Sequence, residues 1–131
     1  MYYEYLPCVE AIAEEFRKEG APFYLTKLFA PHFAADAAIV NISSSRDHMS
    51  RPQTESYTAA KGGIAALTHA LAVSLAGRVR VNSISPGWID TAYRVYDGPD
   101  ALQQPVGRVG NPMDIANRAL YMPWSEIFKK Q

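Results

Sequence analysis

Tyr57 and Lys61 are the two side chains whose types and spacing are best suited to chemistry. Residues four apart on a helix lie one above the other on the same face, so the lysine ammonium can act on the tyrosine hydroxyl. A phenol is a poor acid–base catalyst at neutral pH, but a neighbouring cation favours its ionised form and makes proton exchange easier. The spacing alone also fits a tyrosine that packs at a helix surface, because Tyr-x-x-x-Lys occurs by chance in many helices.

Two strand ends could bring further polar groups to this pair. Serines occupy positions 43–45 after an apolar run, with Ser44 thirteen residues before Tyr57, and Pro86-Gly87 follows a second run. Open α/β sheets bind ligands at the carboxyl ends of their strands, so Ser44 and the Pro-Gly turn are candidates for one site. Alternatively, the serines could only bond to nearby backbone, and the turn could only end a strand.

The hydrophobic pattern predicts the elements that position these groups. Residues 37–42 are typical of a buried strand, residues 57–76 have helical spacing, and residues 79–85 alternate like a second strand. A crossover helix of this length makes the strands parallel and their connection right-handed, which is half of a doubly wound α/β fold. The helix is predicted to bury Ile64, Leu67, Leu71 and Leu75.

Other helices should flank this unit. One is predicted over residues 6–19, and a second from Pro22 until Pro31 kinks or ends it. Residues 92–110 are predicted to form a loop, after which Asn111 caps a last helix that has Pro112 at its first position.

Composition and charge exclude several classes of protein. The 131 residues suffice for one domain, and 13 Lys+Arg against 13 Asp+Glu leave no electrostatic reason to bind nucleic acid or an anionic membrane. The amino-terminal residues are rich in Glu and lack a long apolar run, so neither a signal peptide nor a membrane span is predicted. Cys8 is the only cysteine, which excludes an intramolecular disulfide and makes the cytoplasm the expected location. The three histidines lack metal-ligand spacing, so no metal site is expected.

Three stretches together resemble the short-chain dehydrogenase/reductase family. They are residues 39–44 (IVNISS), residues 57–63 (YTAAKGG) and residues 81–91 (VNSISPGWIDT). The resemblance continues through residues 105–116 and back through residues 21–27. It implies a single, incomplete Rossmann-like domain over residues 1–131, a partial doubly wound α/β fold with a short parallel sheet flanked by helices, in which residues 21–120 match the catalytic half.

The resemblance also implies a function. It implies an oxidoreductase that moves hydride between NAD or NADP and a small carbonyl or alcohol substrate. In that family, the tyrosine that matches Tyr57 exchanges a proton with the substrate oxygen. The lysine that matches Lys61 assists the tyrosine and holds the nicotinamide ribose. The serine that matches Ser44 orients the substrate carbonyl. The backbone at Ile89 and the Thr91 hydroxyl would hold the nicotinamide carboxamide. The residues expected to bind the cofactor are therefore Tyr57, Lys61, Pro86, Gly87, Ile89 and Thr91.

The sequence departs from the family pattern in the segment that would bind the cofactor's pyrophosphate. The glycine-rich turn is absent, because Leu6, Pro7 and Cys8 stand where glycines are expected. The first strand, the Asn-Asn-Ala-Gly stretch and the final strand are not found either, and the family's catalytic Asn is assigned to no residue. Weak cofactor binding is therefore expected, with a dissociation constant of about 1 mM or weaker. An alternative hypothesis is a noncatalytic remnant or interaction module that keeps only the family's assembly surface.

Two features predict a homo-oligomer. Two parallel strands leave two unpaired edges, which proteins usually cover. The predicted helix over residues 57–76 also carries small residues that allow close helix approach, and in the family the corresponding helix and its predecessor form a dimer bundle. These small residues are Ala59, Ala60, Gly62, Gly63, Ala66 and Ala70.

Overall fold

This computed structural model describes Glu14, Arg17, residues 20–92, Arg94, Tyr96 and residues 98–124. The helix predicted over residues 6–19 thus lies outside the described residues apart from Glu14 and Arg17, and so do residues 6–8. The elements in chain order are α2 (Ala21–Phe29), the 3-10 helix η1 (Ala30–His32), β1 (Ala38–Ile42), the 3-10 helix η2 (Ser45–Asp47), α3 (Glu55–Ser74), β2 (Arg80–Ile84), α4 (Pro99–Leu102) and α5 (Pro112–Trp124).

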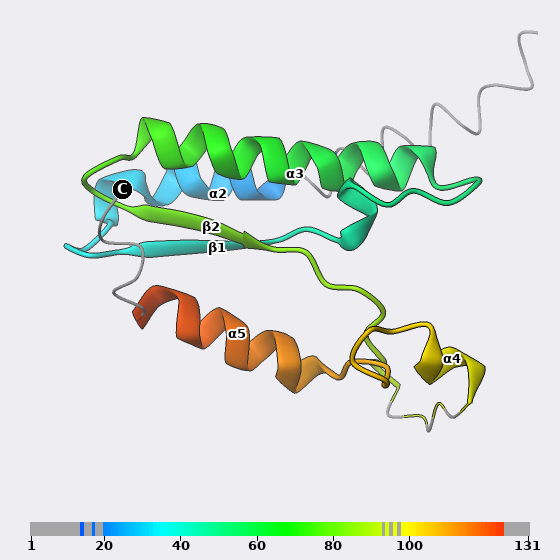
Figure 1. Ribbon diagram of the computed structural model, residues 1–131. Coiled ribbons are helices and arrows are strands. Elements are labelled where there is room, and N and C mark those ends of the chain that lie inside the picture. Colours follow the sequence, from blue (N-terminus) through cyan, green and yellow to red (C-terminus); the bar gives the residue numbers. More distant parts are fainter. Residues whose placement is uncertain are drawn as a thin grey trace, which may run out of the picture.

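The fold is an α/β arrangement around one pair of parallel strands, as the sequence predicts. Ala38 lies opposite Arg80 at one end of the pair and Ile42 opposite Ile84 at the other. The helices α2 and α3 lie on one side of the sheet and α5 lies on the other (Figure 1). The crossover helix α3 explains the parallel pairing, because a chain must return to the same end of the sheet before it starts the second strand.

The helix α3 faces the strands with residues four apart. Ala60, Ile64 and Thr68 are its buried residues. The predicted apolar face was therefore only partly correct, since Leu67, Leu71 and Leu75 are half-buried. The face turned to the sheet carries a small residue and a hydroxyl, and the Thr68 Oγ1 atom accepts a hydrogen bond of 2.9 Å from Asn41 Nδ2 on β1. A polar contact between the layers thus sets the rotation of the helix.

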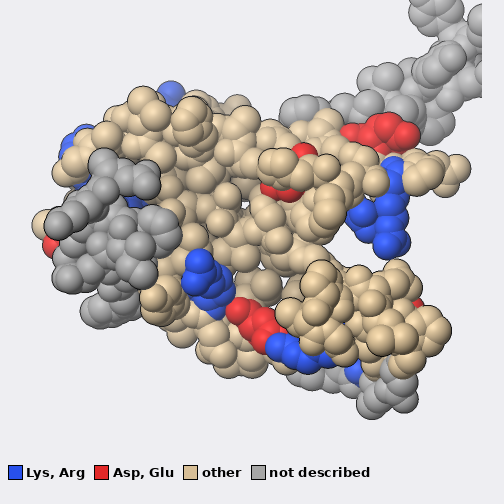
Figure 2. Space-filling model, in the orientation of Figure 1, with Lys and Arg blue, Asp and Glu red and all other residues tan. Residues whose placement is uncertain are grey.

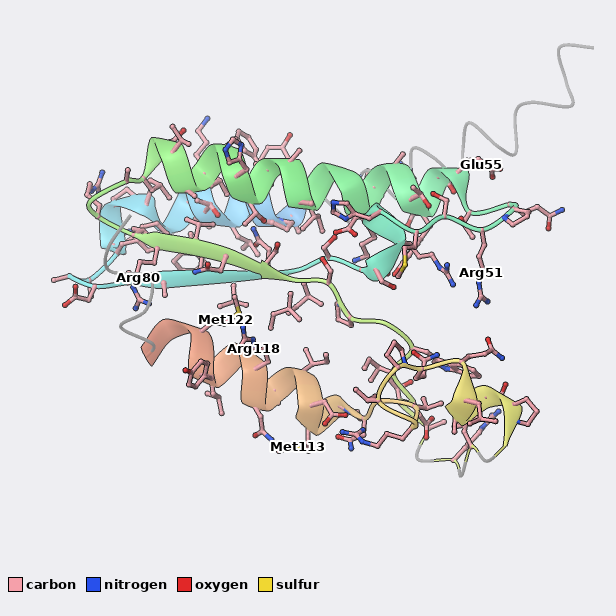
Figure 3. All side chains as sticks on the ribbon, viewed as in Figure 1. Arg51, Glu55, Arg80, Met113, Arg118 and Met122 are labelled. Atoms are coloured by element: carbon pink, nitrogen blue, oxygen red, sulfur yellow. The ribbon has the colours of Figure 1, made fainter. Side chains whose placement is uncertain are left out.

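The helix α5 covers the opposite side of the sheet. Asn111 Oδ1 accepts a hydrogen bond of 3.2 Å from the Asp114 backbone N–H, which confirms the predicted cap. Figure 3 shows Met122 on the side of α5 that faces the sheet and Met113 on the opposite side. Met122 is buried, and its carbonyl accepts a hydrogen bond of 3.2 Å from Arg80 Nη1 on β2. This contact ties the end of α5 to the start of β2.

The remaining boundaries follow local rules. The helix α2 ends at Phe29 and is followed by η1, which contains Pro31, so the predicted break is confirmed. The predicted loop over residues 92–110 is wrong at one point, because Pro99 starts the short helix α4. Proline fixes φ at a value that suits the first turn of a helix, and Gly98 before it takes a positive φ of 59°.

Candidate active site

The predicted site residues lie at the carboxyl end of the strand pair. Ser44 follows β1, Pro86 follows β2, and Tyr57 and Lys61 lie in the first turns of α3. The ladder between the strands continues beyond their ends, because the Ser43 N–H donates to the Ile84 carbonyl at 2.8 Å and the Ser45 N–H donates to the Pro86 carbonyl at 2.9 Å. Figure 2 shows a hollow between the part of the molecule that carries η2 and the start of α3 and the part that carries α4.

Tyr57 and Lys61 lie together as their spacing predicts. The Lys61 Nζ atom lies 5.7 Å from the centroid of the Tyr57 ring. It also donates a hydrogen bond of 3.4 Å to the carbonyl of Ile42, the last residue of β1. The Tyr57 side chain remains 38% exposed. A cation held by the sheet therefore lies beside a phenol that solvent or a ligand can reach.

The two serines after β1 differ in what their hydroxyls can do. The Ser43 Oγ atom lies 2.8 Å from the Lys61 carbonyl and 3.1 Å from Asp47 Oδ2, so its single proton is bound within the framework. The Ser44 Oγ atom instead accepts a hydrogen bond of 3.2 Å from the Arg46 backbone N–H. This leaves the Ser44 hydroxyl proton available for another acceptor.

Asp47 is a residue of the candidate site that sequence reasoning missed. Its side chain is 2% exposed, and its Oδ2 atom accepts hydrogen bonds from Ser43 and, at 2.8 Å, from Ser85 after β2. Its Oδ1 atom contacts His48 Nδ1. Burial alone would raise the pKa of Asp47, but the hydrogen bonds from His48, Ser85 and Ser43 outweigh it and hold the pKa below its ordinary value. The one signal in the sequence was a carboxylate three residues after Ser44.

The segment after β2 is fixed by a second set of contacts. Ile89 forms an isolated parallel bridge with Gly110, whose N–H donates to the Trp88 carbonyl at 3.0 Å. A Cβ atom at position 110 would collide with the Ile89 side chain, so only glycine fits there without a shift. The Asp90 carboxylate accepts the backbone N–H groups of Ala92, at 2.8 Å, and Arg94. Ile89 and the exposed Thr91 are therefore held on either side of a buried aspartate.

An ion pair fixes the approach to α5. Arg108 donates two hydrogen bonds, of 2.7 and 2.8 Å, to the Asp114 carboxylate. These bonds and the one from the Asn111 N–H lower the pKa of Asp114 to about 2. The pair closes the loop that carries Gly110 against the first turn of α5.

The candidate site thus consists of two groups. Ser44, Tyr57 and Lys61 surround the end of β1, whereas Ile89 and Thr91 belong to the segment that pairs with Gly110. Within the described residues, no hydrogen bond connects the second group to Tyr57 or Ser44. The part of the chain that the structure describes also contains no group of three His, Cys, Asp or Glu side chains able to hold a metal ion. None of its helices is both long enough and apolar enough to cross a membrane.

Comparison with known proteins identifies relatives of this arrangement. A sequence model of the family described as enoyl-(acyl carrier protein) reductase matches residues 18–126. An uncharacterized oxidoreductase of Thermotoga maritima is 49% identical over 94 residues, which are 64% of this chain and 37% of that protein.

Two solved structures share the fold. A short-chain dehydrogenase/reductase from Brucella melitensis, described as a glucose/ribitol dehydrogenase, is 31% identical with a TM-score of 0.71, over 77% of this chain and 43% of that one. An NADPH-bound short-chain oxidoreductase from Pseudomonas aeruginosa PAO1, with an atypical catalytic centre, is 26% identical with a TM-score of 0.81. The match covers 93% of this chain and 53% of that one.

The chain spans about half the length of these relatives or less. The matched region nevertheless contains both strands, the crossover helix and α5. From the fold and these matches together it follows that the chain belongs to the short-chain dehydrogenase/reductase family.

Proposed function

We propose that this chain is an oxidoreductase that uses NAD or NADP to interconvert a small alcohol and the corresponding carbonyl compound. The observation that carries the proposal is the Lys61 Nζ atom, held by the Ile42 carbonyl and 5.7 Å from the Tyr57 ring. The Brucella melitensis relative is described as a glucose/ribitol dehydrogenase, which supports a sugar or polyol as the alcohol. The reducing cytoplasm, which fits a single cysteine, is where we expect the chain to act.

Tyr57 is the group that exchanges the proton. Its exposed hydroxyl donates a proton to the carbonyl oxygen when the substrate is reduced and accepts one when the alcohol is oxidised. The Lys61 ammonium lies 5.7 Å from the centre of the Tyr57 ring, so a hydrogen-bond donor for the cofactor's ribose lies beside the group that exchanges the proton. The carbonyl of Ile42 keeps that ammonium in place.

Ser44 is the second donor to the substrate oxygen. Its Oγ atom accepts the Arg46 N–H, which leaves its own proton for the substrate oxygen. Two donors on one oxygen stabilise the negative charge that develops there during reduction. Ser43 cannot replace Ser44 in this role, because its proton is engaged by the Lys61 carbonyl and Asp47.

The donors on this chain suit the nicotinamide end of NAD(P), which takes up or releases hydride when bound. The Lys61 ammonium and Tyr57 hydroxyl suit the ribose hydroxyls, and the Thr91 hydroxyl with the Ile89 backbone suits the carboxamide. Pro86-Gly87 connects the two groups of residues. The Pseudomonas aeruginosa relative binds NADPH, which supports this choice of cofactor. Affinity is expected to be weak, because the sequence lacks a glycine-rich turn for the pyrophosphate.

Replacement of Tyr57 by phenylalanine tests the proposal. We expect Tyr57→Phe to lower turnover at least about 100-fold, the range in which general acid–base groups contribute. Turnover is followed by nicotinamide absorbance with sugar alcohols and either NAD or NADP. Tyr24→Phe is the matched control, because Tyr24 is 70% exposed on α2 and should leave turnover unchanged. Wild-type turnover in Tyr57→Phe would contradict the mechanism, and a wild-type chain without turnover would favour an interaction module.

We also propose that the chain forms a homo-oligomer through α3. Its exposed side carries small residues, which allow another helix to approach closely. Introducing an arginine by Ala66→Arg should therefore weaken the assembly. Sedimentation equilibrium measures this, and a wild-type species at the chain mass of 14.5 kDa at every concentration would contradict it. The exposed small residues are Ala59, Gly63, Ala66 and Ala70.

A further inference from the structure

Asp47 lies where the ends of the two strands meet. Its carboxylate accepts hydrogen bonds from Ser43, at the end of β1, and from Ser85, at the end of β2. Its other oxygen contacts His48, whose ring is exposed. The side chain of Asp47 is itself 2% exposed, whereas the Ser85 and His48 side chains that contact it are exposed. One carboxylate therefore connects two strands whose ends are 42 residues apart in the chain, from Ser43 to Ser85.

The backbone of Asp47 acts on Ser44 directly. The Asp47 N–H donates a hydrogen bond of 3.0 Å to the Ser44 carbonyl. The same 3-10 turn places the Arg46 N–H 3.2 Å from the Ser44 Oγ atom. Next to it, the Ser45 N–H donates to the Pro86 carbonyl at 2.9 Å. The turn that fixes the Ser44 side chain is therefore anchored at its far end by the Asp47 carboxylate.

We propose that Asp47 is a positioning residue that fixes the Ser44 hydroxyl between the ends of β1 and β2. The proposal rests on the function proposed above for Ser44. A carboxylate suits this task because its oxygens accept several hydrogen bonds at once and its charge strengthens each of them. An amide of the same size has one acceptor oxygen, so it cannot hold Ser43, Ser85 and His48 in the same way.

Amide hydrogen exchange of the full chain, measured by NMR, tests the proposal without requiring activity. We expect Asp47→Ala to speed exchange at Ser45 and Arg46 by about tenfold or more, while Ile64 in the middle of α3 keeps its wild-type rate. Ser85→Ala, which removes one donor and leaves Asp47 in place, should produce a smaller increase at Ser45. Asp100→Asn on α4 is the control and should change neither rate.

Two results would overturn the proposal. One is a wild-type exchange rate at Ser45 and Arg46 in Asp47→Ala, and the other is an equal increase at Ile64, which indicates general destabilisation. If Asp47→Ala does not fold, Asp47→Asn and Ser85→Ala give the same comparison. In an active chain, Asp47→Asn should lower kcat about tenfold and leave the KM for the cofactor unchanged. A wild-type chain without turnover would contradict the proposed function, whereas the exchange rates would still decide the role of Asp47.

Discussion

Replacing Thr68 by valine removes the hydrogen bond that joins α3 to β1. The Asn41 Nδ2 atom donates to Thr68 Oγ1 at 2.9 Å, and the Thr68 hydroxyl donates to the Ile64 carbonyl at 2.8 Å. Both residues are 7% exposed. Valine has nearly the same shape as threonine but no hydroxyl. The substitution therefore leaves the Asn41 amide buried without an acceptor while it changes the packing little.

The expected cost follows from that unsatisfied amide. A buried polar group that loses its partner costs about 1–3 kcal/mol. The loss of the hydrogen bond from the Thr68 hydroxyl to the Ile64 carbonyl adds little, because that carbonyl keeps its helical hydrogen bond. We therefore expect Thr68→Val to lower the free energy of unfolding by about 2 kcal/mol. For a domain of this size, the melting temperature should fall by roughly 8 °C.

Urea unfolding followed by circular dichroism measures this change. The midpoint should fall while the slope of the transition stays the same, because the surface exposed on unfolding is unchanged. A double-mutant cycle with Asn41→Leu identifies the cause, since removing both polar groups should cost less than the sum of the single changes by about 1 kcal/mol or more. Thr58→Val is the control, because among the described residues its hydroxyl contacts only the Thr54 hydroxyl, at 3.3 Å, at a half-buried position in the first turns of α3. A wild-type midpoint for Thr68→Val, or strict additivity, would refute the reasoning.

Two further predictions concern Gly110 and Asp47. Gly110→Ala should lower the free energy of unfolding by about 1 kcal/mol in the same urea assay, because the new methyl group displaces the end of the Ile89 side chain and crowds the Trp88 carbonyl. Gly62→Ala, where nothing lies within 4 Å, should instead raise it by about 0.5–1 kcal/mol, and equal effects would contradict the clash. The pKa of Asp47 is lowered in the folded chain, so its contribution to stability is present above about pH 4 and is lost as the pH falls further. In acid unfolding curves, Asp47→Asn should lose less stability than the wild type below pH 4, and parallel curves would count against this.

The elements that the sequence predicts well are those specified by neighbouring residues. The apolar run over residues 37–42 and the alternating stretch over residues 79–85 bound both strands to within one residue, because each is flanked by polar or turn-forming residues. Asn111 and Pro112 mark the start of α5 for the same local reason. Tyr57 and Lys61 meet because four residues make about one helical turn.

The features that sequence reasoning misses depend on partners far along the chain. Asp47 joins the candidate site because Ser85, 38 positions later, comes to lie beside it. The buried face of α3 includes Thr68 rather than Leu71, because Thr68 forms a hydrogen bond with Asn41 on β1 where the helix packs on the sheet. Neither partner can be identified from spacing, because tertiary packing alone brings them together.

The parallel pairing of β1 and β2 has a consequence for how quickly the chain folds. All of η2 and α3 lies between the two strands, so the first hydrogen bond of the sheet closes a loop that contains a complete helix. Closing such a loop costs chain entropy before any sheet contact compensates for it, whereas α3 forms from local contacts. The sheet should therefore appear late, on a helix that is already present. We therefore expect the docking of β2 beside β1, at the edge where Ser44 and Pro86 meet, to limit the rate of folding.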